Sequence, residues 1–254
     1  MWHKVADSPA LLEKYTVILF DLRGYGASSK PPGLEPYVKS EMAKDCIVVM
    51  RHFGFESFFV CAHDRGARVA HKLCVDYPKA VSKVMLLDIC PTLAMYQSTN
   101  FEFAKAYFHW FLLIQPSPLP ETMIGAKPRQ IAGMLLGGGR AGGLDIFGPN
   151  FDYYAKLLED PDTVHTMCQD YRAGATSDLE EQKADIEAGR KIQCPVRVLW
   201  GRLGVIEKSF DAIKEWKAVI KTDVSVDGVA VDSGHFIPEE APNEVLTHIL
   251  EFLV

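Results

Sequence analysis

The stretch Val60-Cys61-Ala62-His63-Asp64-Arg65-Gly66-Ala67-Arg68-Val69-Ala70 joins a short apolar run to a helical pattern, with a burst of charge between them. Residues 57–62 are rich in Phe and Val and predict a buried strand, and residues 66–77 predict a helix that a proline ends. Asp64 is therefore expected on the turn between them. The alanine two positions before it and Gly66 two positions after it allow a sharp turn that exposes the carboxylate. This is the spacing of a nucleophile elbow, with Asp in place of the usual Ser.

Strand and helix patterns alternate over much of the remaining chain. Further apolar runs of strand length cover residues 16–22, 81–89, 196–200 and 225–231. This alternation predicts an α/β fold with a parallel sheet that helices cover on both faces. Residues 91–190 interrupt it with helical or irregular segments. We therefore expect a core of residues 1–90 and 191–254, and a helical cap of residues 91–190 over the carboxyl ends of the strands, where ligands bind in such sheets.

Composition limits the classes of partner. The 254 residues carry a formal net charge of -6 with scattered basic side chains, which gives no electrostatic reason to expect nucleic acid or an anionic membrane. The six cysteines form no C-x-x-C pair, and no cationic N-terminus precedes an apolar segment. No apolar run approaches the roughly 18 residues that cross a bilayer. We expect a reduced, cytoplasmic protein with a small-molecule anionic substrate; a homodimer and a monomer both stay open.

A carboxylate nucleophile needs a base that activates water and an acid that orients the base. His235 lies between the last predicted strand and the last predicted helix, and the chain order of elbow, acid and late histidine favours it over an ordinary surface histidine. Asp88 closes the strand that follows the elbow helix, so it is expected at the same edge of the sheet as Asp64. Glu207, in the loop after the next strand, is the weaker alternative for the acid.

Arg65 and Arg68 lie three residues apart at the start of the elbow helix, so they share one face. Cations beside a helix N-terminus oppose the macrodipole, and a bound anion would remove that conflict. Because a guanidinium group suits a forked contact with a carboxylate, the pair predicts an acidic substrate. The alternative interpretation is that each arginine pairs with acidic residues of the cap.

Three cap residues, His109, Trp110 and Tyr171, offer N–H and O–H donors that suit a departing halide, although aromatic residues at helical spacing more often belong to a core. The glycine-rich stretch at residues 137–140 lacks the Lys-Ser/Thr pair and the preceding strand of a phosphate-binding loop. The sequence contains neither H-E-x-x-H nor another recognisable metal-ligand spacing. We therefore expect neither a metal nor another cofactor.

Several of these segments together resemble one known family. The chain is similar over nearly its whole length to the α/β-hydrolase fold, and within it to the fluoroacetate (haloacetate) dehalogenases. The motifs that carry the resemblance are Asp21-Leu22-Arg23-Gly24-Tyr25-Gly26-x-Ser28, His63-Asp64-Arg65-Gly66-Ala67-Arg68, Leu87-Asp88-Ile89-x-Pro91-Thr92, His109-Trp110, Tyr171-Arg172-Ala173 and Gly234-His235-Phe236. The first motif is general to α/β-hydrolases, whereas H-D-R-G-x-R combined with H-W and Y-R-A is fairly specific.

The resemblance implies hydrolysis of a 2-haloacid to a 2-hydroxy acid through a covalent aspartyl ester. By motif position, it implies Asp64 as nucleophile, His235 as base, Asp88 as orienting acid, Arg65 and Arg68 as carboxylate ligands, and His109, Trp110 and Tyr171 as halide contacts. The family also has, ahead of a position like Trp2, a strand and a His-Gly loop that supplies a second oxyanion donor. The printed sequence holds neither, so we expect these N-terminal strands to be missing, a gap in the sheet between residues 16–22 and 57–62, and a poorly stable, weakly active chain.

Two other functions fit the same residues. An epoxide hydrolase uses the same Asp-His-acid set but activates its epoxide with cap tyrosines, usually a pair, of which Tyr171 supplies one. The paired arginines favour an anionic substrate over a neutral epoxide. The second alternative is a non-catalytic, ligand-binding relative of the hydrolases. The intact set of Asp64, Asp88 and His235 argues against it, and the missing oxyanion loop argues for it.

Overall fold

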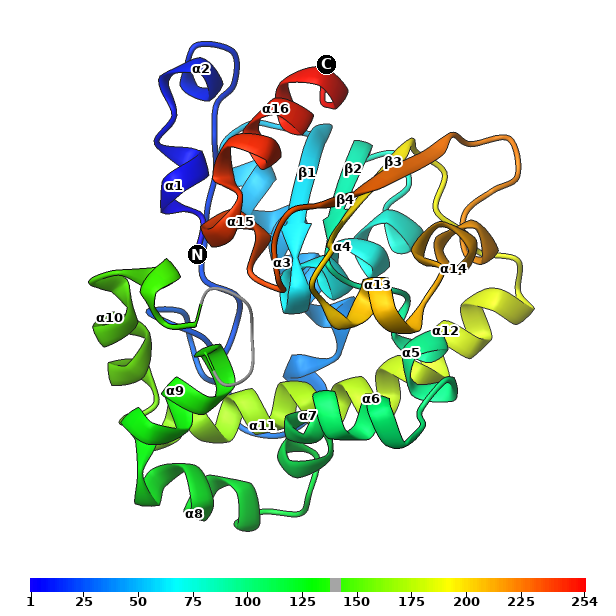
Figure 1. The fold of residues 1–254 in the computed structure, drawn as a ribbon. Helices are drawn as coiled ribbons and strands as arrows, with labels where there is room; N and C mark the ends of the chain where they lie inside the picture. The colour runs from blue at the N-terminus through cyan, green and yellow to red at the C-terminus, as the bar shows by residue number, and fades with distance from the viewer. Residues whose placement is uncertain (138–142) are drawn as a thin grey trace.

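A parallel sheet lies at the centre of the computed structural model, which describes residues 1–137 and 143–254 (Figure 1). Within these residues the sheet has four strands in the order β1-β2-β3-β4, and each neighbouring pair is parallel. The strands are β1 (Phe58–His63), β2 (Val81–Leu87), β3 (Val196–Gly201) and β4 (Val226–Val231). Helices separate them along the chain, so the predicted α/β class is confirmed.

Each face of the sheet buries its own apolar layer. In β2, Val84 and Leu86 belong to one layer and Met85 and Leu87 to the other, as the two-residue period of a strand requires. All four side chains are 0% exposed, which is typical of a strand covered on both faces. The helices of the first layer are α3 (Lys39–His52), α4 (Asp64–Asp76) and α14 (Ala212–Ala218); those of the second are α1 (His3–Ala6), α2 (Pro9–Leu12), α15 (Ile237–Glu240) and α16 (Pro242–Phe252).

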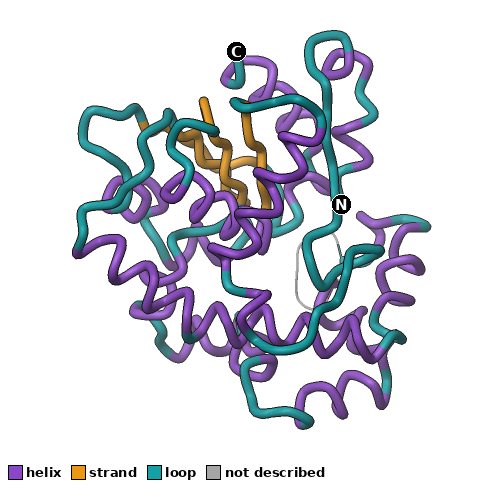
Figure 2. Tube along the Cα trace, turned by 180° about the vertical axis from the view of Figure 1, so that it is seen from behind, coloured by secondary structure: helices purple, strands orange, loops and turns teal. Residues whose placement is uncertain are grey.

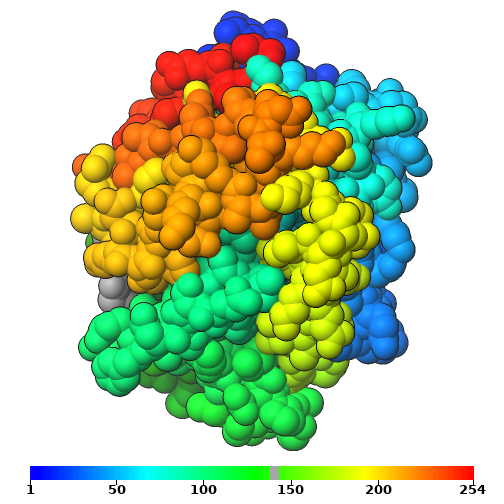
Figure 3. Space-filling model, turned by 90° about the vertical axis from the view of Figure 1, so that its right-hand side faces the viewer, coloured from blue at the N-terminus to red at the C-terminus, as the bar shows by residue number. Residues whose placement is uncertain are grey.

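The segment between β2 and β3 consists mainly of helices joined by short loops in its described residues, and we call it the cap. It consists of α5 (Thr92–Gln97), α6 (Phe101–Ala106), α7 (Phe108–Leu113), α8 (Leu119–Ala126), α9 (Pro128–Gly137), the short η2 (Asp145–Phe147), α10 (Asn150–Leu157), α11 (Pro161–Ala175) and α12 (Ser177–Glu187). Figure 3 shows this green-to-yellow block packed beneath the orange and red part of the core. The glycine-rich stretch discussed above lies mostly outside the described residues. Outside the cap, the remaining short helices are η1 (Glu35–Tyr37) and α13 (Val205–Ser209).

Residues 16–22 do not form the predicted strand; they are irregular and are drawn as a loop in Figure 2. β1 is the outermost strand of the sheet, and β2 is its partner. Leu19 and Phe20 are 56% and 40% exposed, whereas a strand covered on both faces would bury them. An extended segment becomes part of a sheet only where a neighbouring strand pairs with its backbone N–H and C=O groups. In the part of the chain that the structure describes, residues 16–22 have no such neighbour.

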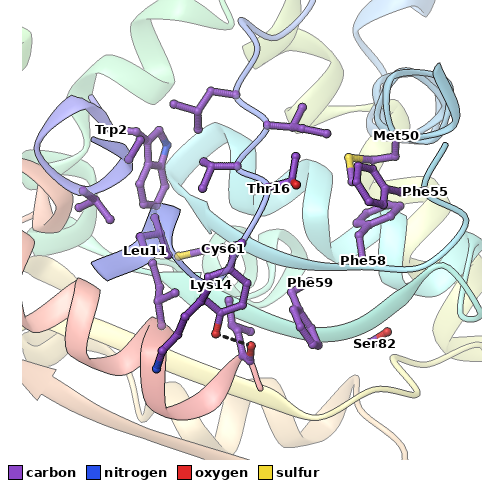
Figure 4. Close-up of a pocket in the computed structure, with 18 of the residues that line it drawn as sticks. Trp2, Leu11, Lys14, Thr16, Met50, Phe55, Phe58, Phe59, Cys61 and Ser82 are labelled. Carbon is purple, nitrogen blue, oxygen red and sulfur yellow. Dashed lines mark hydrogen bonds between the residues drawn. The ribbon is translucent and has the colours of Figure 1, made fainter. Parts of the chain in front are cut away.

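An apolar groove separates residues 16–22 from β1. One part of it, with a volume of about 380 Å³, lies between Trp2 and Thr16 on one side and Phe58 and Phe59 on the other (Figure 4). A second cavity of about 940 Å³ follows β1 toward its end. The groove lies between residues 16–22 and β1, and no strand among the described residues pairs with the outer edge of β1.

Candidate active site

Asp64 is the first residue of α4 and directly follows β1. Its φ is 45°, in the left-handed region that side chains other than glycine rarely adopt. Such a conformation costs on the order of 1–3 kcal/mol and persists where the surrounding structure enforces it, often at functional sites. The predicted turn is present, but Asp64 itself adopts the unusual conformation. A Cβ added to Gly66 would meet nothing within 4 Å, so the described packing does not require a glycine there.

His235 lies between both candidate carboxylates. It follows β4 in the loop before α15, as the sequence predicts. Its Nδ1 is 2.6 Å from Oδ2 of Asp88, and its Nε2 is 3.7 Å from Oδ2 of Asp64. The imidazole therefore faces the carboxylate of the turn with one nitrogen and a buried acid with the other. This is the order of nucleophile, base and orienting acid.

Asp88 is fixed on both of its oxygens. Oδ2 contacts His235, and Oδ1 accepts a hydrogen bond of 2.9 Å from the backbone N–H of Gly201. The side chain is 0% exposed and the φ of Asp88 is 51°, a second left-handed residue at the end of a strand. Glu207 instead accepts a hydrogen bond from the indole of Trp200 at the surface. The structure therefore brings Asp88, rather than Glu207, against His235.

The carboxylates and the imidazole of this group stabilise each other's charged forms. Burial alone would lower the pKa of His235, but the adjacent carboxylates Asp64 and Asp88 raise it above its ordinary value. Burial alone would raise the pKa of Asp64, but its interaction with His235 holds that pKa well below the usual range. Asp64 is therefore ionised at neutral pH, which is the form that a carboxylate nucleophile requires.

His63, to which the sequence analysis assigns no role, also contacts this group. It is the last residue of β1, and its Nε2 lies 2.7 Å from the backbone oxygen of His235. Burial and the nearby charge of His235 lower the pKa of His63 to about 4, so the ring is neutral at pH 7. The only hint of such a contact in the sequence is the position of His63 directly before Asp64 in the quoted motif. The contact itself joins residues 172 positions apart, which no local pattern predicts.

Arg65 is paired with an acid of the cap. Its Nε donates to Oδ2 of Asp170 on α11 at 2.6 Å, and its Nη2 donates to the backbone oxygen of Asp170 at 2.9 Å. Asp170 is 0% exposed and also accepts hydrogen bonds from Lys39 at 2.5 Å and from Tyr25 at 2.7 Å. Arg65 therefore pairs with an acidic residue of the cap, which is the alternative interpretation of its charge given above. Much of this guanidinium is already occupied by protein groups.

Arg68 differs from Arg65 in its surroundings. It is 3% exposed, its Nη1 donates to Oγ1 of Thr92 at 2.9 Å, and its Nη2 contacts the sulfur of Met95 at 3.3 Å. Its Nε is buried without a hydrogen-bond partner, and none of the ion pairs among the described residues includes it. Burial and the charge of Arg65 lower the pKa of Arg68. A buried cation without an acid is costly, so the site suits an anionic ligand.

Two of the three predicted halide residues lie against these arginines, and the third lies beside one of those two. The guanidinium carbon of Arg65 is 4.2 Å from the centre of the Tyr171 ring, and that of Arg68 is 4.7 Å from the Trp110 ring. The rings of His109 and Tyr171 are 6.2 Å apart. All three aromatic residues are buried, and burial raises the pKa of Tyr171, so its hydroxyl keeps its proton. The structure therefore brings Tyr171 against Arg65 and Trp110 against Arg68, and it places His109 beside Tyr171.

The cavity that follows β1 reaches the nucleophile. Its lining includes Tyr25, Asp64, Arg65 and Phe236, and the Asp64 side chain is 30% exposed. Asp64 is thus accessible from the groove beside the sheet edge.

Within the described ranges, no group of three or more His, Cys, Asp or Glu side chains is arranged to hold a metal ion. No helix in those ranges is long and apolar enough to span a membrane.

Comparison with known proteins gives consistent results. A model of the α/β hydrolase fold matches residues 1–242. Fluoroacetate dehalogenase from Burkholderia sp. is 38% identical over an alignment that covers 100% of this chain and 82% of that protein. Soluble epoxide hydrolase from Corynebacterium sp. (strain C12) is 29% identical, with coverage of 99% and 84%. The crystal structure of a provisionally assigned α/β hydrolase from Nostoc sp. PCC 7120 matches with a TM-score of 0.92 and 46% identity, over 100% of this chain and 86% of that one.

Proposed function

Because this chain belongs to the α/β hydrolase fold family, we propose that it hydrolyses the carbon–halogen bond of a small 2-haloacid of the haloacetate type. The observation that carries this proposal is Arg68, which lies on the same helix as Asp64 and is a buried cation that no ion pair among the described residues includes. A haloacid offers a carboxylate to this cation and an electrophilic carbon to the nucleophile. The 38% identity to a fluoroacetate dehalogenase supports the same substrate class.

The first step forms an ester on Asp64. A carboxylate oxygen of Asp64 attacks the carbon that bears the halogen, the C–O bond forms as the carbon–halogen bond breaks, and the halide leaves with the electron pair. Arg68, assisted by the unoccupied part of Arg65, holds the substrate carboxylate and so orients the carbon toward Asp64. His109, Trp110 and Tyr171 receive the halide through N–H and O–H donors in a dry pocket.

The second step hydrolyses that ester. His235 takes a proton from a water molecule through Nε2, and the resulting hydroxide attacks the carbonyl carbon of the Asp64 ester. Asp88 keeps the His235 proton on Nδ1, so that Nε2 is free to act as a base, and stabilises the imidazolium that forms. The tetrahedral oxyanion needs backbone donors, of which the N–H of Arg65 in the first turn of α4 is one. When this intermediate collapses, the bond between the former carbonyl carbon and the substrate oxygen breaks, and the imidazolium of His235 gives its proton to that oxygen. The 2-hydroxy acid leaves, and the carboxyl group of Asp64 loses its proton to solvent and returns to its ionised form.

Epoxide hydrolysis is the second candidate function. It uses the same Asp64–His235–Asp88 arrangement, and the protonated hydroxyl of the buried Tyr171 is suited to donate to an epoxide oxygen. The similarity to a soluble epoxide hydrolase favours testing it. A neutral epoxide, however, would leave the charge of Arg68 without a counterion, so the haloacid is the better substrate for this pocket.

Incubation with fluoroacetate, chloroacetate and styrene oxide separates these functions. We expect halide and glycolate from the haloacids and little diol from styrene oxide. In the His235→Ala variant, the first step proceeds and the ester remains, so mass spectrometry of the peptide that contains Asp64 should show the added carboxymethyl group. Free glycolate from this variant without any such mass increase would contradict the two-step scheme. Binding of haloacids without product from the unmodified protein would favour a ligand-binding relative.

A further inference from the structure

His63 links the strand of the nucleophile to the loop of the base. The side chain is 8% exposed and its ring lies 4.7 Å from the ring of His235 and 6.1 Å from that of Phe236, measured between centroids. Its Nε2 is 2.7 Å from the backbone oxygen of His235. One side chain of β1, adjacent to Asp64 in sequence, thus contacts both the ring and the backbone of the candidate base.

The direction of this hydrogen bond follows from the partner. A carbonyl oxygen can only accept, so Nε2 of His63 must carry the proton. The neutral ring supplies one N–H, and the contact with His235 fixes it on Nε2. His63 is therefore a neutral donor in a fixed tautomer, which is unsuited to exchange protons with substrate but well suited to hold a loop.

Other contacts hold the same loop from its opposite side. The carboxylate of Glu240 accepts from the backbone N–H of Gly234 at 2.6 Å and from that of Phe236 at 2.9 Å. These contacts fix the loop to α15, the helix that directly follows it. The bond from His63 instead fixes it to β1 and so to the nucleophile. The distance of 3.7 Å between Nε2 of His235 and Asp64 depends on the relative position of these two parts.

We propose that His63 is a positioning residue that sets the His235 ring for the second step of the reaction, an inference that rests on the proposed haloacid hydrolysis. The first step uses Asp64 and the arginines and does not need His235. The second step needs Nε2 of His235 within one water molecule of the Asp64 ester. Loss of the His63 donor therefore slows ester hydrolysis and leaves ester formation unchanged.

Two substitutions of His63 separate the donor from the packing. His63→Phe keeps a buried ring and removes the N–H, whereas His63→Gln places an amide N–H near the position of Nε2. His71, in the middle of α4, is the matched control, because it is also 8% exposed and packs its ring against that of Trp216. In His71→Phe the same replacement is made without touching the loop of His235.

Chloroacetate turnover gives the kinetic readout. A buried hydrogen bond of this kind corresponds to about 10- to 100-fold in rate, so kcat should fall by about that factor in His63→Phe. The initial burst of one halide per site and kcat/KM, which reports ester formation, should stay within twofold. His63→Gln should recover most of kcat, and His71→Phe should retain the wild-type ratio of kcat to kcat/KM. A parallel fall of kcat and kcat/KM in His63→Phe, or an unchanged kcat, would overturn the proposal.

Proton NMR of the imidazole N–H groups provides a readout without substrate. The Nδ1–H of His235 in its 2.6 Å contact with Asp88 should give a low-field resonance, assigned by its loss in His235→Ala. We expect this resonance to shift upfield or disappear in His63→Phe and to persist in His63→Gln and His71→Phe. If the unmodified protein releases no halide, haloacid hydrolysis is wrong, yet this comparison still decides the role of His63. An unchanged resonance in His63→Phe would show that His63 does not position the ring.

Discussion

Replacing Arg68 by methionine should stabilise the fold while it weakens the proposed activity. Arg68 is 3% exposed and has no acid partner among the described residues, and its Nε is without a hydrogen bond. Removal of such a group relieves a desolvation cost of about 1–3 kcal/mol, and methionine fills a similar volume. The free energy of unfolding should therefore rise by an amount in this range.

The substitution of Arg65 by methionine should have the opposite effect on stability. Arg65 contacts Asp170 at 2.6 Å in a buried ion pair, so its loss leaves a carboxylate with fewer partners. Breaking a buried pair costs about 3–5 kcal/mol. Because Lys39 and Tyr25 still donate to Asp170, we expect the lower end of this range. The two variants thus differ by about 4–6 kcal/mol in the free energy of unfolding, although both remove one arginine from the same helix face.

Urea unfolding followed by circular dichroism and halide release from chloroacetate measure the two effects. A charged hydrogen bond contributes about 1.5–3 kcal/mol, so loss of the Arg68 contacts with the substrate carboxylate should lower kcat/KM by about 100-fold. Acetate, which offers the same carboxylate, should stabilise the unmodified protein against urea and not the Arg68→Met variant. Equal destabilisation by both substitutions, or an Arg68→Met variant with unchanged kcat/KM, would refute the assignment of Arg68 as the unpaired cation.

Three further predictions concern the base, the acid and the groove. The pKa of His235 is raised and the base must be neutral, so turnover of chloroacetate should fall as the pH drops through this raised pKa. The halide burst should persist, because Asp64 stays ionised. Equal pH profiles of burst and turnover would contradict this prediction. Asp88→Asn should reduce turnover by up to about 10⁴-fold, because His235 is then no longer held in the tautomer that has its proton on Nδ1. Glu207→Gln should leave turnover unchanged. A comparable loss in both variants would show that the orienting acid is misassigned. Phe59 is 39% exposed on β1, whose outer edge pairs with no described strand, and it should promote self-association. The Phe59→Lys substitution should therefore reduce light scattering on heating and have little effect on the midpoint of thermal unfolding. Unchanged scattering would mean that this edge is not the site of association.

The sequence predicts the main layout of the fold because its signals are local. Short apolar runs followed by helical patterns indicate the strands, and the carboxyl ends of parallel strands must meet at one edge. That rule alone brings Asp64, Asp88 and His235 together, and the structure joins them through contacts of 2.6 Å and 3.7 Å. The prediction of strands from apolar runs fails for residues 16–22, whose sequence pattern is that of a buried strand. A strand also needs a neighbour, and pattern alone does not provide one.

The surroundings of the two arginines could not be predicted, because they depend on contacts between distant segments. Arg65 and Arg68 are adjacent on one helix face and look equivalent in the motif. The partner of Arg65 is Asp170, 105 residues away, and nothing in the spacing indicates which arginine that acid selects. His63 is a similar case, since its contact is with the backbone of His235, a residue that the cap and three strands separate from it.

A count of charges around α11 then distinguishes the two proposed substrates. Lys39, Arg65 and Arg68 are three buried cations, and Asp170 and Asp178 are the buried acids that contact two of them, with Lys39 lying 2.5 Å from the first and 3.2 Å from the second. Arg68 is the one of the three whose positive charge no acid contacts among the described residues, and its guanidinium group lies over the ring of Trp110. A substrate with a single carboxylate balances this charge, whereas a neutral epoxide leaves it buried without a counterion. The proposed preference for a monoanionic haloacid therefore rests on Asp170, the acid that pairs with Arg65, and on the lack of such an acid for Arg68 among the described residues.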